Sequence, residues 1–238
     1  MSNEKIYTIR ITEAMNQKCG CPLCTVEDKL EADELERILG AAMMEPDVRV
    51  KTNEQGFCEK HLDRLLGMSN KLSYALMLQT HLAEFTKKLY RDSIPLLKNT
   101  PDPKKQLAVL EKKRKSCYVC ARKREFMSAT YSAFAYMYRT DAEFDGRMRE
   151  QPYFCLRHMH CLLEAAGREL SKEAYRGFCR TLNDINGAYS QELLGDLDWF
   201  CKKFDYRYKD EDWKNSKDSI ERTILTLTGQ YPKKDSKS

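Results

Sequence analysis

The stretch GFCEKH, at residues 56–61, recurs almost unchanged as YFCLRH at residues 153–158. In both copies an aromatic residue precedes a cysteine, and a histidine follows that cysteine three positions later. Each copy lies downstream of a Cys-x-x-Cys pair, which is CPLC at residues 21–24 and CYVC at residues 117–120. The same combination of cysteine and histidine residues therefore occurs twice in the chain.

The spacing of the two copies is also matched. Cys117 follows Cys21 by 96 positions, and His158 follows His61 by 97. A repeat of this length indicates two copies of one small domain. We therefore predict a first metal-binding helical module, a second one, and a C-terminal helix with a tail, at residues 1–99, 100–212 and 213–238.

The repeated residues are those that bind a soft or borderline metal ion. Two residues between two cysteines let a tight turn direct both thiolates at one ion, and Cys-x-x-His does the same on the first turn of a helix. We expect each repeat to close its own site with three thiolates and one imidazole. The predicted first site is Cys21, Cys24, Cys58 and His61, and the predicted second site is Cys117, Cys120, Cys155 and His158.

Zinc is the metal that these ligands favour, with two ions per chain, because the ligands come as two separated pairs and complete a tetrahedron. Four protein ligands leave no open position, which is typical of structural rather than catalytic zinc. An iron–sulfur cluster bound by the same ligands is the alternative, and it would make the chain a redox protein. Four cysteines stand outside the pattern, and their roles stay open: Cys19, Cys161, Cys179 and Cys201.

Composition is that of an ordinary globular protein, with 42% hydrophobic and 32% charged residues in 238. The N-terminal residues have no apolar core of signal-peptide type, and no apolar run approaches the length of a membrane span. We therefore expect a cytoplasmic protein without a membrane association. In a reducing compartment, clustered cysteines with nearby histidines indicate metal rather than disulfides.

Glycine and proline are sparse, and helix-forming residues dominate, so we expect an all-α protein whose long helices pack the modules together. Amphipathic or capped helices are predicted at residues 25–43, from Ser69 or Asn70 towards Pro95, from Pro103 to Cys117, at 121–139, from Ser171 or Lys172 to about 206, and at 216–228. Two segments are predicted not to be helical. Apolar and polar residues alternate in Ile6–Ile11 as in an edge strand, and residues 45–56 are predicted to form a loop.

Charge is unevenly distributed. Residues 27–36 are strongly acidic, whereas residues 104–124 contain nine Lys or Arg and a single Glu. A basic segment of this kind could bind nucleic acid, which would make the chain a nucleic-acid-binding regulator. The net charge of only +5 favours another interpretation, in which the basic segment and the acidic helix attract each other.

Four segments together, EKIYTIRITEAMNQKCGCPLC, MMEPDVRV, GFCEKH and LMLQTHLAEF, resemble the uncharacterised bacterial domain-of-unknown-function family 6062. The resemblance covers nearly the whole chain and implies a small bacterial protein with paired cysteine motifs, but no activity. The chain also lacks a Ser/His/Asp order, a P-loop and a GxGxxG motif. We therefore favour a non-enzymatic binding or scaffold protein that recognises an unidentified protein or associates with itself.

Overall fold

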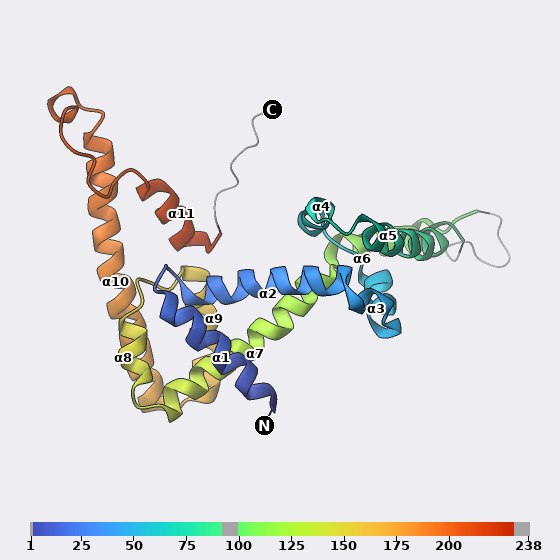
Figure 1. Cartoon of the computed structure of the whole chain (residues 1–238), viewed down its shortest axis with the longest axis horizontal. Helices are drawn as coiled ribbons and strands as arrows, with labels where there is room; N and C mark the ends of the chain where they lie inside the picture. Colours follow the sequence, from blue (N-terminus) through green and yellow to red (C-terminus); the bar gives the residue numbers. More distant parts are fainter. Residues whose placement is uncertain (1, 92–99, 231–238) are drawn as a thin grey trace. The chain divides into compact units, whose positions relative to one another are not determined.

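The computed structural model describes residues 2–91 and 100–230. Throughout these residues the chain is all-α, as predicted, and contains no strand (Figure 1). It divides into two compact units: Met1–Asp28 with Met127–Ser238 form the first, and Lys29–Phe126 form the second. None of the described helices is both long and apolar enough to cross a bilayer.

Two helices contribute residues to both units, namely α2 (Pro22–Leu39) and α7 (Tyr118–Thr140). The units therefore differ from the two sequence repeats, because each unit contains part of the first repeat and part of the second. The modules at residues 1–99, 100–212 and 213–238 stay a prediction about the repeat in the sequence.

The first unit is built around an aromatic core. Its other elements are α1 (Ser2–Gln17), α8 (Phe144–Arg149), α9 (Leu156–Glu169), α10 (Lys172–Lys202), η3 (Tyr206–Tyr208) and α11 (Ser219–Thr228). Phe134 of α7 meets Phe144, Phe154 and Phe178 edge-on, with ring centroids 4.8, 5.9 and 6.3 Å away. All four rings are fully buried. Edge-to-face contacts of this kind stabilise a core beyond the burial of apolar area.

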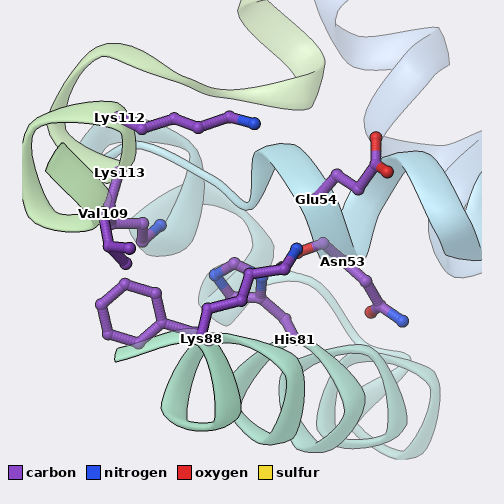
Figure 2. Close-up of a pocket in the computed structure, with 8 residues that line it drawn as sticks. Asn53, Glu54, His81, Lys88, Val109, Lys112 and Lys113 are labelled. Atoms are coloured by element: carbon purple, nitrogen blue, oxygen red, sulfur yellow. Dashed lines mark hydrogen bonds between the residues drawn. The ribbon is translucent and has the colours of Figure 1, made fainter. Parts of the chain in front are cut away.

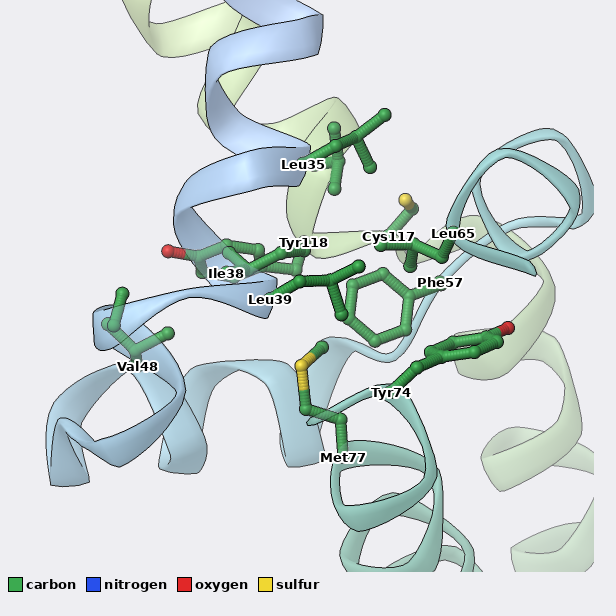
Figure 3. Close-up of a cluster of buried hydrophobic side chains, with 12 residues drawn as sticks. Leu35, Ile38, Leu39, Val48, Phe57, Leu65, Tyr74, Met77, Cys117 and Tyr118 are labelled. Carbon is green, nitrogen blue, oxygen red and sulfur yellow. The ribbon is translucent and has the colours of Figure 1, made fainter. Parts of the chain in front are cut away.

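The second unit has a mixed aliphatic and aromatic core (Figure 3). Its other elements are η1 (Ala41–Met44), α3 (Pro46–Gln55), α4 (Glu59–Gly67), α5 (Lys71–Thr86), η2 (a π-helical segment, Lys87–Arg91) and α6 (Pro103–Lys115). The core gathers Leu35, Ile38 and Leu39 of α2, Tyr74 and Met77 of α5, and Tyr118 of α7 around Phe57. Phe57 precedes Cys58 just as Phe154 precedes Cys155. The aromatic residue of the repeated motif therefore anchors a cysteine to the core of its unit.

The predicted strand at Ile6–Ile11 is wrong, because these residues lie within α1. The side chains of Ile11, Ala14 and Met15 are buried at helical spacing, and this longer pattern outweighs the short alternation before it. Thr12 also lies within α1, and its hydroxyl donates to the carbonyl oxygen of Thr8 at 2.9 Å.

The predicted loop at residues 45–56 also proves to be mostly helix. Pro46 takes the first position of α3, where its missing N–H costs nothing. Val48 and Thr52 turn to the core, and the helix ends at Gly56 with a φ of 60°. In the second repeat the corresponding small helix is α8, which begins after Glu143 without a side-chain capping contact.

Three helix starts are confirmed by their capping contacts. The side chains of Asn70, Asp102 and Ser171 accept hydrogen bonds from the backbone N–H groups of Ser73, Lys104 and Ala174. The end of the helix expected before Pro95 and the frayed tail expected after residue 232 lie outside the described residues.

Candidate metal centres

The eight predicted ligands gather into two clusters. Cys21, Cys24, Cys155 and His158 form the first cluster, in the first unit, and Cys58, His61, Cys117 and Cys120 form the second cluster, in the second unit. In each cluster the four ligand atoms all lie within 4.8 Å of one another. Two groups of three thiols and one imidazole could thus each hold a metal ion, as the sequence indicates.

The predicted pairing of these ligands is wrong. We expected Cys21 and Cys24 to share an ion with Cys58 and His61 of the same repeat. Instead each cluster combines the Cys-x-x-Cys pair of one repeat with the Cys-x-x-His pair of the other. Each repeat therefore contributes one ligand pair to each of the two clusters.

The length of the helices explains this exchange. Cys21 and Cys24 stand at the start of α2, whose 18 residues extend for about 27 Å. The segment expected to return the chain to its start forms η1 and α3, and α3 packs against η1 and α5 within the second unit. Cys58 therefore emerges beside the C-terminal half of α2, where the start of α7 brings Cys117 and Cys120.

Distances within the clusters match those around one tetrahedral ion. Zinc–ligand bonds of about 2.3 Å to sulfur and 2.0 Å to nitrogen place two sulfurs about 3.8 Å apart and a sulfur about 3.5 Å from the nitrogen. In the first cluster, Nδ1 of His158 lies 3.5, 3.4 and 3.3 Å from the sulfurs of Cys21, Cys24 and Cys155. The sulfurs of Cys24 and Cys155 are 3.6 Å apart.

The second cluster has the same dimensions. Nδ1 of His61 lies 3.2, 3.2 and 3.5 Å from the sulfurs of Cys58, Cys117 and Cys120. The sulfurs of Cys58 and Cys120 are 3.9 Å apart. Both clusters therefore enclose room for one ion at their centre.

Each pair of ligands stands at the N-terminus of a helix. Cys58 and Cys155 are the N-cap residues of α4 and α9, and the histidine follows within the first turn. Cys21 and Cys117 immediately precede α2 and α7. The partial positive charge at a helix N-terminus favours an ionised thiolate, which is the form that binds a metal.

A buried glutamate of α2 faces each histidine from the side opposite the sulfurs. Nε2 of His61 lies 3.2 Å from Glu31, and Nε2 of His158 lies 3.3 Å from Glu27. The exposed fractions of Glu31 and Glu27 are 1% and 7%. A carboxylate in this position holds the ring so that Nδ1 is directed at the ion.

The sequence analysis missed these two carboxylates, because it treated residues 27–36 as one acidic face. Glu27 and Glu31 are four positions apart, one turn of the helix, and that spacing on a helix that begins with a ligand pair is the signal that could have revealed them.

Cations neutralise the buried carboxylates. Glu31 pairs with Lys60 and Lys123, each at 2.9 Å, and also with Arg64. Burial raises the pKa of Glu31, but its contacts with His61, Lys123 and Lys60 outweigh burial and hold the pKa well below the usual range. Beside the first cluster, the guanidinium group of Arg157 forms a bidentate ion pair with the carboxylate of Glu27. Lys123 of the basic segment thus contacts Glu31 of the acidic helix, as expected if the two segments attract each other.

The thiols of the second cluster affect one another's ionisation. Burial raises the pKa of Cys117, but hydrogen bonds from His61 and from the backbone outweigh it and lower the pKa to about 6. Burial and the negative charge of Cys117 raise the pKa of Cys120 to about 12. Three thiolates at this separation repel each other, so a divalent cation is what allows all three to ionise together.

A glycine approaches each cluster where no other residue would fit. Gly229, the αL residue that ends α11, has a φ of 68°, and a Cβ there would lie 2.8 Å from the sulfur of Cys155. Gly56 precedes the ligand pair of α4, and a Cβ there would lie 2.5 Å from the ring of His81. Its carbonyl oxygen accepts a hydrogen bond from the N–H of Tyr118 at 2.9 Å, which joins the two ligand segments of the second cluster.

The remaining cysteines stand apart from both clusters. Cys19 is exposed and contacts Gln17, while Cys161 and Cys179 are half-buried. Cys201 is exposed. His160 is exposed, lies 3.8 Å from Glu164 and does not belong to the first cluster.

No curated protein and no solved structure matches the chain. The model of one protein family does match it, along residues 1–234, and that family is described as a family of unknown function, DUF6062. Since the match covers nearly every residue, including all eight cysteine and histidine ligands, the chain belongs to the DUF6062 family.

Proposed function

We propose that the protein is a cytoplasmic binding or scaffold module whose two units are each held by one structural zinc ion. The observation that carries this is the set of distances within the clusters, where three sulfurs and one nitrogen surround a centre at the separations of tetrahedral zinc. The reduced state of thiols in the cytoplasm keeps such ligands available.

The same distances weigh against the iron–sulfur alternative. A cluster of two or four irons with bridging sulfides distributes its four protein ligands over at least two irons, so some ligand atoms would lie further apart than the 4.8 Å within which all four ligand atoms of each cluster lie. A single iron would fit this space, and metal analysis distinguishes it from zinc.

A structural role follows from the closed ligand sets. Four protein ligands complete the tetrahedron, so a bound ion has no position left for water or a substrate. Each ion would join two segments far apart in sequence, such as residues 21–24 and 155–158. Metal binding of this kind contributes directly to the free energy of folding.

One surface supports the binding role. Helix α5 is apolar on more than one side, and α3 and α4 cover part of it. Leu72, Leu76 and Leu82 remain exposed, with exposed fractions of 72, 38 and 61%. Lys71 and Glu84 are exposed and carry opposite charges near the two ends of α5, so an antiparallel pair of copies would bring the positive end of one helix near the negative end of the other. We therefore assign this face to self-association.

Metal analysis of protein purified without oxygen tests the proposal. About two zinc ions per chain and no visible absorption are expected. Cys155→Ser and Cys58→Ser should each lose one ion and melt at a lower temperature, whereas the control Cys179→Ser should keep both. A brown protein that contains iron in place of zinc would overturn the assignment and favour the redox function.

A further inference from the structure

A small open pocket lies in the second unit between α5 and α6 (Figure 2). Its volume is about 60 Å³, which is room for one small polyatomic group. The lining residues come from α3, α5, η2 and α6, and they are Asn53, Glu54, His81, Phe85, Lys88, Val109, Lys112 and Lys113. None of them is a ligand of the metal clusters.

The lining is strongly basic. Lys112 and Lys113 enter from α6, and Lys88 enters from the opposite side, from η2 (Figure 2). Glu54 is the one acidic residue among those that line the pocket. Three ammonium groups around so small a volume repel one another, and a bound anion relieves that repulsion.

The imidazole of His81 adds a polar group whose orientation is fixed. Its Nδ1 donates to the carbonyl oxygen of Asn53 at 2.9 Å, which leaves Nε2 on the side of Gly56 and Lys113. Burial lowers the pKa of His81, and the nearby charges of Lys113 and Lys88 lower it further. An anion in the pocket would oppose that effect.

The pocket is held in shape by the same segments that carry the second cluster. Lys113 donates to the carbonyl oxygen of Phe57 at 3.0 Å, and Ser116 donates to that of Gln55 at 2.7 Å. Lys88 projects from the π-helical segment η2, and such segments occur frequently at functional sites. The basic groups therefore lie on segments whose positions are fixed by these contacts, and they are not simply distributed along a solvated helix.

We propose that this pocket binds one phosphoryl group, either as free phosphate or as the phosphate of a small metabolite. Lysines bind phosphate as point charges, and charge-assisted contacts of this type are the strong ones. Phe85 and Val109 give the pocket an apolar wall against which the organic part of a phosphate ester can pack. The proposal goes beyond the structural role of the metal, and it holds whether the second cluster takes zinc or iron.

Calorimetric titration of the metal-loaded full chain with inorganic phosphate tests the proposal, with ionic strength held constant by sodium chloride. We expect saturable binding at one site per chain. Lys88→Gln combined with Lys112→Gln should weaken it by at least about tenfold, which is the effect of losing one charge-assisted contact. Both lysines are exposed, so the variant should keep its helical circular dichroism and its metal content.

The matched control is Lys104→Gln with Lys105→Gln. It removes the same number of charges, both from α6, which also carries Lys112, but neither residue lines the pocket. Its phosphate affinity should stay within about twofold of the parent, since charges beyond about a Debye length are screened. Heat changes that chloride alone reproduces, or an equal loss of affinity in both double variants, would contradict a specific site.

Two further probes identify the source of the phosphoryl group. Phenyl phosphate should bind more tightly than inorganic phosphate if a metabolite packs against Phe85 and Val109, and equally if free phosphate is the ligand. A 12-nucleotide single-stranded RNA should bind weakly. RNA binding that falls steeply with salt and that is reduced equally by the control substitutions would overturn the proposal, because the whole basic segment at residues 104–124 would then be a nucleic-acid surface.

Discussion

Single residues next to the ligands decide how well each cluster can hold a metal. Glu31 and Glu27 are buried carboxylates that exist in the fold only because a histidine and several cations surround them. An unpaired charge at these depths would be strongly destabilising. Their position behind the rings indicates that they orient the imidazoles rather than bind the ion.

Substitution of Glu31 by Gln tests this orienting role. The amide keeps the volume but not the charge, so the affinity of the second cluster for zinc should fall about 10- to 100-fold, while the first cluster is unchanged. Competition with a chelator measures both sites. Glu36→Gln is the matched control on the same helix, because Glu36 is exposed, and an equal loss in the control would show that general charge is responsible.

Gly229 offers a second prediction at this scale. Gly229→Ala forces a Cβ against the sulfur of Cys155 in a left-handed conformation, and we expect a loss of about 1–3 kcal/mol in the free energy of unfolding. Gly187→Ala is the control, since nothing lies within 4 Å of its Cβ and it stands inside α10. The control should stabilise the protein by up to about 1 kcal/mol, as Ala does in helix interiors. Denaturant unfolding measures both, and a neutral Gly229→Ala would show that α11 does not press on the first cluster.

At the scale of elements, the helices determine which ligand pairs meet. Each of α2, α4, α7 and α9 begins at one ligand pair, so the sites join helix N-termini. Helix α2 is too long for its own Cys-x-x-His pair to return to its start within the 16 residues between Leu39 and Gly56, ten of which form α3.

Paired substitutions distinguish the two pairings. Cys21→Ser with Cys155→Ser alters one cluster, so this variant should keep about one zinc per chain. Cys21→Ser with Cys58→Ser alters both clusters and should lose nearly all zinc. The pairing within each repeat predicts the reverse. Elemental analysis of the two variants therefore decides the matter without a structure.

At the scale of the whole molecule, the described residues include two closed clusters that could each hold a metal ion, a basic pocket and an apolar helix face. The clusters connect segments from different repeats, so a metal ion bound there would link metal binding to the folding of the chain. The face on α5 is the part of the described surface that we assign to another copy.

Replacement of Leu72 by Glu tests self-association. A charge in the middle of an apolar contact between copies is destabilising, so light scattering should show a dimer in the parent and a monomer in the variant. Leu66→Glu on α4 is the control, because Leu66 is similarly exposed but belongs to another helix. A parent protein that is monomeric at all concentrations would contradict the assignment of this face to self-association.

The sequence by itself determined the helical class, the eight cysteine and histidine residues that form the clusters, and the capping residues Asn70, Asp102 and Ser171, because these depend on contacts within one or two turns of chain. It misjudged Ile6–Ile11 and residues 45–56, where burial against distant side chains selected helix over the local pattern. Only the tertiary structure decided that Cys21 and Cys24 meet Cys155 and His158, and that Glu27 and Glu31 stand behind the histidines. Spacing directs two ligands at one point, but the lengths and packing of the helices determine which other pair arrives there.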